Sequence, residues 1–340
     1  MYEEQYQPPH SHWLEELCAL PGVSGREGPV RDWIIAHLPA GAAYRVDPLG
    51  NLIVNGGQEK VMLCAHMDEV GLIVTHITDE GLLKFDHVGG IERAAYLGRQ
   101  VFVGKNALPG VIGVVPVHLL RAEAKKQLPA QESLCIDIGA DSREAAARLV
   151  KPGDTATFEP GFTRFGEGFV QSKALDDRVG CLILLELLWQ NTGLCAVFSA
   201  REEVGGAAAA AAFALRPRCA VIIETTTASD LPGVSGAQRV CELGGGAVVP
   251  FMDRGTMYAR ELYERAMSLA KKAGIPAQTK SVIAGANDAH TIHTSAGGIP
   301  CIAISVPCRN LHSPGVVMRE SDARAVFQLA DLLWKELTAQ

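Results

Sequence analysis

The sequence lacks the features that mark membrane-spanning and nucleic-acid-binding proteins. Its most apolar stretch, residues 181–189, is too short to cross a bilayer and contains Glu186. It has no stripe of lysine and arginine, and its 31 basic and 38 acidic residues give a net charge of −7. Nothing in it would neutralise a phosphate backbone. We therefore predict no membrane partner and no nucleic-acid partner.

Disulfide and secretion signals are also absent. The nine cysteines are odd in number, form no CxxC pair and lie inside apolar stretches such as residues 61–66, which indicates buried, reduced thiols. The first residues, MYEEQYQPPHSHW, are acidic and lack the apolar core of a signal peptide. These absences predict a cytoplasmic protein.

The patterns that are present predict an α/β fold. With 340 residues, the chain is longer than the ~250–300 residues at which single cores stop growing, so we expect about two domains. Short apolar runs followed by polar residues or glycine predict buried parallel strands at 61–65, 194–200, 219–224 and 300–306. Helical patterns alternate with these runs at 175–191, 260–276 and 321–337. The alternation predicts a doubly wound mixed sheet with helices on both faces.

The middle of the chain has a different pattern. From residue 71 to residue 163, β signals follow one another closely, and one helix interrupts them at Asp141-Ser-Arg-Glu144, which has capping-box spacing. Because the α/β pattern occurs on both sides, we expect a small β-rich domain, 71–163, inserted into a larger domain formed by 1–70 and 164–340.

Acidic residues and histidines lie at the predicted carboxyl ends of the strands, where open α/β sheets bind ligands. Each of them alone has an ordinary explanation as a turn residue, a helix cap or a solvated charge. Together, their charges in one cleft would be costly without cations to neutralise them. The residues are His66, Asp68, Glu202, Glu203, Glu224 and His312, with Asp176 and Asp177 before the long apolar helix.

Two histidines with four or five carboxylates suit two divalent ions, whereas a structural zinc site would normally use cysteine. Such ions lie ~3.5–4 Å apart, share a bridging carboxylate, and activate a water for attack on a carbonyl or phosphoryl centre. One carboxylate must stay unligated to take the proton of that water. Glu202 and Glu203 suit this division, because neighbouring side chains at a strand end point different ways.

Eight motifs occur in order along nearly the whole chain: PGVSGREGPVRD (21–32), DPLGNLIV (47–54), AHMDEVG (65–71), KALDDRVG (173–180), REEVGGAA (201–208), TTTASDLPG (225–233), NDAHTIHTSAGGIP (287–300) and RNLHSPG (309–315). With these motifs the chain resembles the TET-type aminopeptidases, the metallopeptidase family forty-two that includes glutamyl and leucyl aminopeptidases. The resemblance implies two divalent ions per subunit, which would be zinc, cobalt or manganese.

The resemblance also implies a role for each site residue. The first ion would be bound by His66 and Glu224, the second by Glu203 and His312, with Asp176 bridging both, Asp68 orienting His66 and Glu202 acting as general base. It further implies a cis peptide bond between Asp176 and Asp177. The chain departs from the family pattern at Glu224, where many members carry aspartate, and at residues 285–289, where GANDA replaces a GTDA-like segment.

By the same resemblance, the substrates would be peptides cleaved after the N-terminal residue. The inserted β domain would be PDZ-like and would mediate dimerisation, and the dimers would assemble into a hollow tetrahedral dodecamer.

Two other functions stay open at this point. A related metal-dependent deacylase or carboxypeptidase would use the same ions, although those families lack the DDR and HSPG context and usually carry a different, ferredoxin-like insertion. A non-catalytic metal-binding scaffold would have no need for an unligated Glu202 beside a metal ligand.

Three further polar residues are not counted among the metal ligands, and His290 and His293 are given structural roles. His290 and His293 lie three apart on a predicted helix close to Asp288, but no nearby glutamate completes a known ligand spacing. Glu69 follows Asp68 directly and is left unassigned, with a turn residue as its ordinary explanation.

Alanine at His290 or at His293 should therefore leave the amount of bound metal unchanged. The metal content of each purified variant, compared with that of the unsubstituted protein, tests this prediction. A stoichiometric loss of metal in either variant would contradict it.

Overall fold

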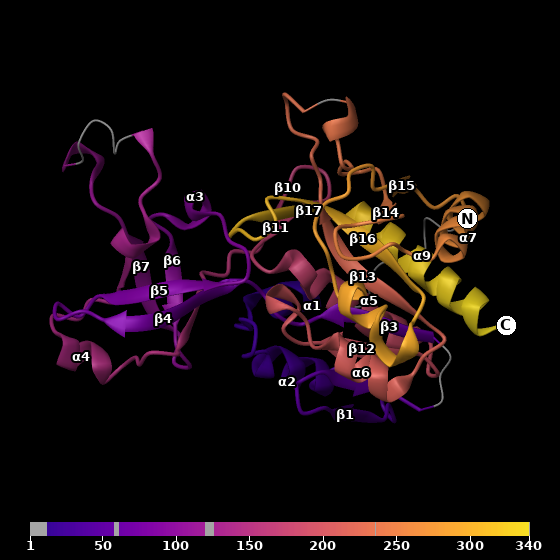
Figure 1. The fold of residues 1–340 in the computed structure, drawn as a ribbon, viewed down its shortest axis with the longest axis horizontal. Coiled ribbons are helices and arrows are strands. Elements are labelled where there is room, and N and C mark those ends of the chain that lie inside the picture. Colours follow the sequence, from indigo (N-terminus) through magenta and orange to yellow (C-terminus); the bar gives the residue numbers. More distant parts are fainter. Residues whose placement is uncertain (1–11, 58–60, 120–125, 235, 340) are drawn as a thin grey trace.

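The computed structural model describes residues 12–57, 61–119, 126–234 and 236–339; residues 1–11, which include most of the acidic N-terminal stretch considered above, lie outside them. Over the described residues the chain forms a large mixed sheet with helices, and a separate antiparallel barrel that lies to one side of it (Figure 1). The predicted mixed α/β fold is confirmed, and the barrel is consistent with an inserted small β domain.

Within the described residues the large sheet has eleven strands. Nine form a continuous path: β1 (Tyr44–Val46), β2 (Leu52–Val54), β12 (Cys195–Ser199), β3 (Val61–His66), β13 (Cys219–Thr227), β16 (Cys301–Arg309), β17 (Val316–Arg319), β11 (Phe169–Ser172) and β10 (Thr163–Phe165). The short strands β14 (Ala247–Val249) and β15 (Ala277–Thr279) branch from β16. The predicted strands β12, β3, β13 and β16 are adjacent and parallel.

The middle of the chain closes into a barrel whose neighbouring strands are all antiparallel. Its strands, in spatial order, are β4 (Gly71–Ile77), β5 (Leu83–Val88), β8 (Cys135–Asp137), β7 (Leu108–Gly113), β6 (Gln100–Val103) and β9 (Thr155–Phe158). It has a separate apolar core, built by residues such as Leu83, Val101 and Ile136. The domain boundaries near residues 70 and 164 stay a prediction.

Two pairs of helices pack against the large sheet: α5 with α9, and α6 with α8. The helices of the described residues are α1 (Trp13–Ala19), α2 (Gly28–Ala36), α3 (Arg93–Tyr96), α4 (Arg143–Ala147), α5 (Leu175–Gln190), α6 (Ala208–Leu215), α7 (Arg260–Ala273), α8 (Ala289–Ile292) and α9 (Glu320–Thr338). None of these is both long and apolar enough to cross a membrane.

The structure corrects two local predictions and refines a third. Strand β13 continues through Thr227, so Glu224 lies inside the strand and not at its end; β-branched threonines favour the extension, which pairs with the equally extended β16. The cap of α4 is Ser142, whose hydroxyl accepts a hydrogen bond from the backbone N–H of Ala145 at 3.4 Å. Asp176 and Asp177 have non-helical backbone angles, so the regular part of α5 begins after them.

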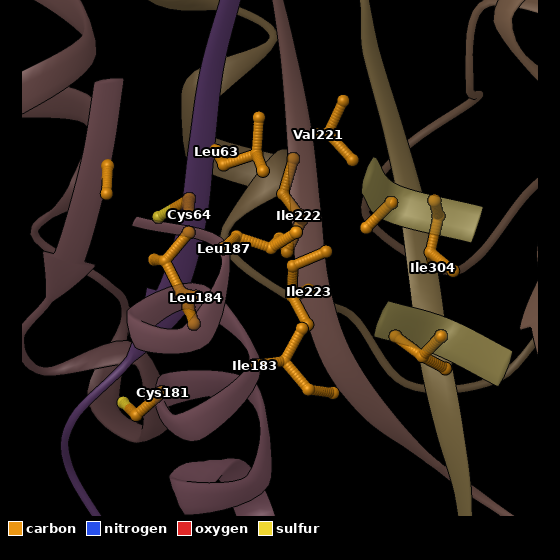
Figure 2. Close-up of a cluster of buried hydrophobic side chains, with 14 of the residues drawn as sticks. Leu63, Cys64, Cys181, Ile183, Leu184, Leu187, Val221, Ile222, Ile223 and Ile304 are labelled. Atoms are coloured by element: carbon orange, nitrogen blue, oxygen red, sulfur yellow. The ribbon is translucent and has the colours of Figure 1, made fainter. Parts of the chain in front are cut away.

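The main core lies between α5 and the strands beneath it. Figure 2 shows Ile183, Leu184 and Leu187 of α5 beside Leu63 of β3 and Ile222 of β13. Each side chain of this kind contributes about 1.5–3 kcal/mol when it is fully removed from water. The apolar sequence of α5 therefore supplies much of the energy that holds β3 and β13 in place, and both strands carry residues of the candidate site.

Leu184→Ala should lower the free energy of unfolding by about 2–5 kcal/mol, because it leaves a cavity in this fully buried core. Leu149→Ala, at an exposed position of the barrel domain, should change it by less than about 0.5 kcal/mol. Denaturant unfolding of both variants measures the difference. Equal effects in the two variants would contradict the packing described above.

Candidate metal centre

The parallel strands bring the candidate residues to one edge of the large sheet. His66 is the last residue of β3, and it is paired in register with Ser199, the last residue of β12. Glu202 and Glu203 follow β12 in a short 3₁₀ turn. Glu224 lies inside the neighbouring strand β13, three residues before its end, and His312 follows β16. Residues distant in sequence therefore meet because their strands are adjacent.

Asp176 lies between the two histidines. Its Oδ1 atom is 3.3 Å from Nε2 of His66, and its Oδ2 atom is 3.4 Å from Nε2 of His312. Glu224 Oε1 lies 3.5 Å from Nε2 of His66, and Glu203 Oε2 lies 3.3 Å from Nε2 of His312. The five side chains thus form two halves, each with one histidine and one glutamate, and each half contacts one oxygen of Asp176.

Asp68 holds several parts of the site together. Its Oδ1 atom lies 3.4 Å from Nδ1 of His66 and accepts the backbone N–H of Glu202 at 3.0 Å. Its Oδ2 atom accepts the hydroxyl of Ser24 at 2.6 Å and the backbone N–H of Glu203 at 3.1 Å. Asp68 therefore contacts both the imidazole and the turn that carries the two glutamates, and sequence reasoning had foreseen only the first of these contacts.

The turn after β12 has an unusual backbone. Arg201 has a φ of 60°, and Gly206 has a φ of 76°. A Cβ atom on Gly206 would come within 3.1 Å of Oδ1 of Asp288, a buried residue that accepts the hydroxyl hydrogen of Ser199 through its other oxygen. Asp288 therefore packs beneath this turn and braces the end of β12. Sequence reasoning did not assign it this place.

Asp177 is also buried at the centre. Its carboxylate accepts the backbone N–H of Gly180 at 3.1 Å and that of His66 at 3.3 Å. It thereby links the first turn of α5 to the end of β3. The peptide bond between Asp176 and Asp177 is cis, as the family resemblance implied.

The donor atoms fit divalent cations. Ligand atoms of His66, Asp176 and Glu203 lie within 4.8 Å of one another, and so do those of His66, Asp177 and Glu224. Imidazole nitrogens and carboxylate oxygens together suit zinc, cobalt and manganese. The site also concentrates negative charge where water cannot solvate it, which is costly unless cations compensate.

The shifted pKa values of the site residues show that the centre requires compensating positive charge. Burial raises the pKa of Glu203 to about 8 and that of Glu224 to about 7. A hydrogen bond to Asp176 raises the pKa of His312 to about 9. Burial acts to raise the pKa of Asp176, but its hydrogen bonds with His312 and His66 outweigh burial and hold that pKa well below its usual range. Without metal, protons supply the compensating charge.

Three other predicted positions have partners elsewhere. His290 Nδ1 is 2.8 Å from the carbonyl oxygen of Gly255, and His293 Nδ1 is 2.8 Å from that of Ala289. Glu69 is not an ordinary turn residue, because its buried carboxylate lies 2.9 Å from Nζ of Lys173. Sequence reasoning did not assign Lys173 a place, and no local pattern linked it to Glu69.

The metal-free protein should become less stable as pH rises from about 6 to about 9. The folded pKa values of Glu203, Glu224 and His312 lie above their ordinary values, so the native state binds more protons than the unfolded chain in this range. Their contribution is present at low pH and is lost as pH rises through the folded pKa values.

Denaturant unfolding of chelator-treated protein at several pH values measures this dependence. His312→Gln removes one of the three groups and should make the decrease shallower. A stability that increases with pH over the same range would show that the centre does not retain protons.

Comparisons with known proteins agree with this geometry. Residues 50–329 match the family model described as M42 glutamyl aminopeptidase. The chain is 33% identical to lysyl aminopeptidase of Pyrococcus furiosus, over 95% of this chain and 96% of that protein.

Solved structures resemble the chain over almost all of its length. An aminopeptidase of Desulfurococcus kamchatkensis has a TM-score of 0.87 and 32% identity, covering 95% of this chain and 93% of that one. The TET1 peptidase of Pyrococcus horikoshii, which can assemble into a tetrahedron or a large octahedral shell, has a TM-score of 0.84 and 36% identity, covering 95% of this chain and 98% of that one. The chain therefore belongs to the M42 glutamyl aminopeptidase family and is a metal-dependent aminopeptidase.

Proposed function

We propose that this aminopeptidase uses two divalent ions and a glutamate general base to remove the N-terminal residue of peptides. The observation that carries the proposal is Asp176, whose two carboxylate oxygens each face a different histidine, at 3.3 Å and 3.4 Å. A carboxylate with this arrangement is suited to bridging two cations. A site for a single ion would not need a second histidine and glutamate on the other side of Asp176.

In this proposal each half of the centre holds one ion. His66 and Glu224 would hold the first, His312 and Glu203 would hold the second, and Asp176 would be shared between them. When bound, the ions lower the pKa of a water molecule and polarise the substrate carbonyl. Asp68 keeps the imidazole of His66 in one orientation, since it lies against the Nδ1 atom.

Glu202 is the proposed general base. Its backbone N–H donates to Asp68, and desolvation of its half-buried side chain raises its pKa well above the ordinary value. A carboxylate with a raised pKa is suited to accept a proton from the attacking water and to donate it to the departing amine. Glu203, the next residue, faces His312 instead, so the two glutamates take separate roles.

We propose that the inserted β domain is PDZ-like and mediates dimerisation, and that the dimers assemble further into a dodecamer. The Pyrococcus horikoshii TET1 peptidase supports this proposal, because it forms closed shells and aligns with 95% of this chain. A cytoplasmic location stays a prediction.

The substrate class can be tested with the metal-loaded protein. After incubation with zinc, cobalt or manganese, it should hydrolyse aminoacyl anilides, it should not hydrolyse N-acyl amino acids, and a chelator should abolish the activity. Hydrolysis of N-acyl amino acids alone would instead identify a deacylase.

Glu202→Gln should lower kcat on the best anilide by about 10²–10⁴-fold, because the substituted side chain cannot accept the proton. Its metal content and its unfolding temperature should remain those of the unsubstituted protein. Glu261→Gln, an exposed position of α7, is the matched control and should keep full activity. An active Glu202→Gln variant would exclude this residue as the base.

A further inference from the structure

Glu69 and Lys173 form a buried ion pair beside the metal centre. Lys173 Nζ lies 3.0 Å and 2.9 Å from the two carboxylate oxygens of Glu69, and it also donates to the carbonyl oxygen of Leu20 at 3.0 Å. The side chains of Lys173 and Glu69 are 1% and 3% exposed. Solvent therefore does not screen this interaction.

The carboxylate of Glu69 has further partners. Its Oε1 atom accepts the backbone N–H of Gly22 at 3.0 Å and lies 3.7 Å from Nη2 of Arg178. The backbone N–H of Glu69 donates to the carbonyl oxygen of Gly22 at 3.0 Å. The pair thus joins three separate parts of the chain: the segment around Gly22, the end of β3, and the residues at the start of α5.

Each of these three parts carries or supports a residue of the centre. Glu69 follows Asp68 directly, and Lys173 precedes Asp176 by three residues. Ser24, just after Gly22, donates its hydroxyl hydrogen to Asp68 at 2.6 Å. A small cavity is lined by both members of the pair together with Asp176, Glu203 and His312, so the pair borders the centre directly.

Stability alone does not account for two opposite charges at this place. Desolvation of a buried ion pair can exceed the Coulombic gain, and apolar residues of similar volume often stabilise a protein equally well. An ion pair with several hydrogen bonds does constrain distance and direction, which apolar contacts do not. The ion pair is therefore suited to fixing the distance between the segment that carries Asp68 and the segment that carries Asp176.

We propose that Glu69 and Lys173 are positioning residues that set the separation between Asp68 and Asp176, and so place the imidazole of His66 between them. This inference rests on the proposed function, because its consequence is the geometry of a two-ion centre. It also gives a role to Glu69 and to the PGVSG motif, which the proposed mechanism leaves without one.

The double variant Glu69→Gln/Lys173→Met tests the proposal, because it removes both charges together and keeps an acceptor for Gly22. It should remain folded with a lowered unfolding temperature, because the buried Arg178 loses the carboxylate that lies 3.7 Å from it. Zinc affinity, measured by calorimetry on chelator-treated protein, should fall by about 10–100-fold. The kcat on an aminoacyl anilide should fall at least about tenfold, with a smaller change in KM.

The matched control is Arg265→Met/Glu336→Gln, which removes an ion pair of 3.5 Å between α7 and α9. It should keep zinc affinity and kcat. A Glu69→Gln/Lys173→Met protein with unchanged zinc affinity and kcat would overturn the proposal, because the pair would then contribute only to folding.

Lys173→Arg decides the matter if the double variant does not fold. Arginine keeps the positive charge but distributes it over a planar guanidinium group. The ion pair with Glu69 therefore remains, while the distance between the segments of Asp68 and Asp176 changes. We expect a folded protein with lowered zinc affinity and lowered kcat; unchanged values would overturn the proposal. Failure of the proposed function is distinguishable, because the unsubstituted protein would then bind no second zinc ion or hydrolyse no anilide.

Discussion

The crowding of carboxylates around Asp176 is the constraint on which the rest of this structure depends. Asp176 contacts two histidines, and each histidine contacts a glutamate. So many acidic groups cannot all be ionised out of water without compensating charge. In the absence of metal the centre retains protons, and the same groups provide a donor set that suits divalent ions.

The large sheet makes this crowding possible. The strands β3, β12 and β13 are buried and parallel, so their ends cannot move apart to relieve repulsion. The packing energy of α5 against these strands offsets the unfavourable electrostatics of the site. Stability is thus concentrated in the strands and helices, and the reactive groups lie on the turns and strand ends that they hold.

Interactions around the centre extend well beyond the proposed ligands. Asp68 accepts hydrogen bonds from Ser24 and from the turn of Glu202, and Asp288 braces the end of β12. The pair of Glu69 and Lys173 lines the same small cavity as Asp176. Hydrogen-bonded neighbours of this kind fix the orientation of ligands, and much of the precision of a metal site depends on them.

The sequence by itself predicted the parallel strands β12, β3, β13 and β16 and the long helices α5, α7 and α9, because apolar periodicity reports which face of an element is buried. It also placed His66, Glu203 and His312 near strand ends, and the family resemblance assigned them roles. Only the tertiary structure decided that β13 runs past Glu224, that Glu69 pairs with Lys173, and that Asp288 lies under the turn after β12. These contacts join residues far apart in the chain, and no local pattern records which distant segment will pack against them.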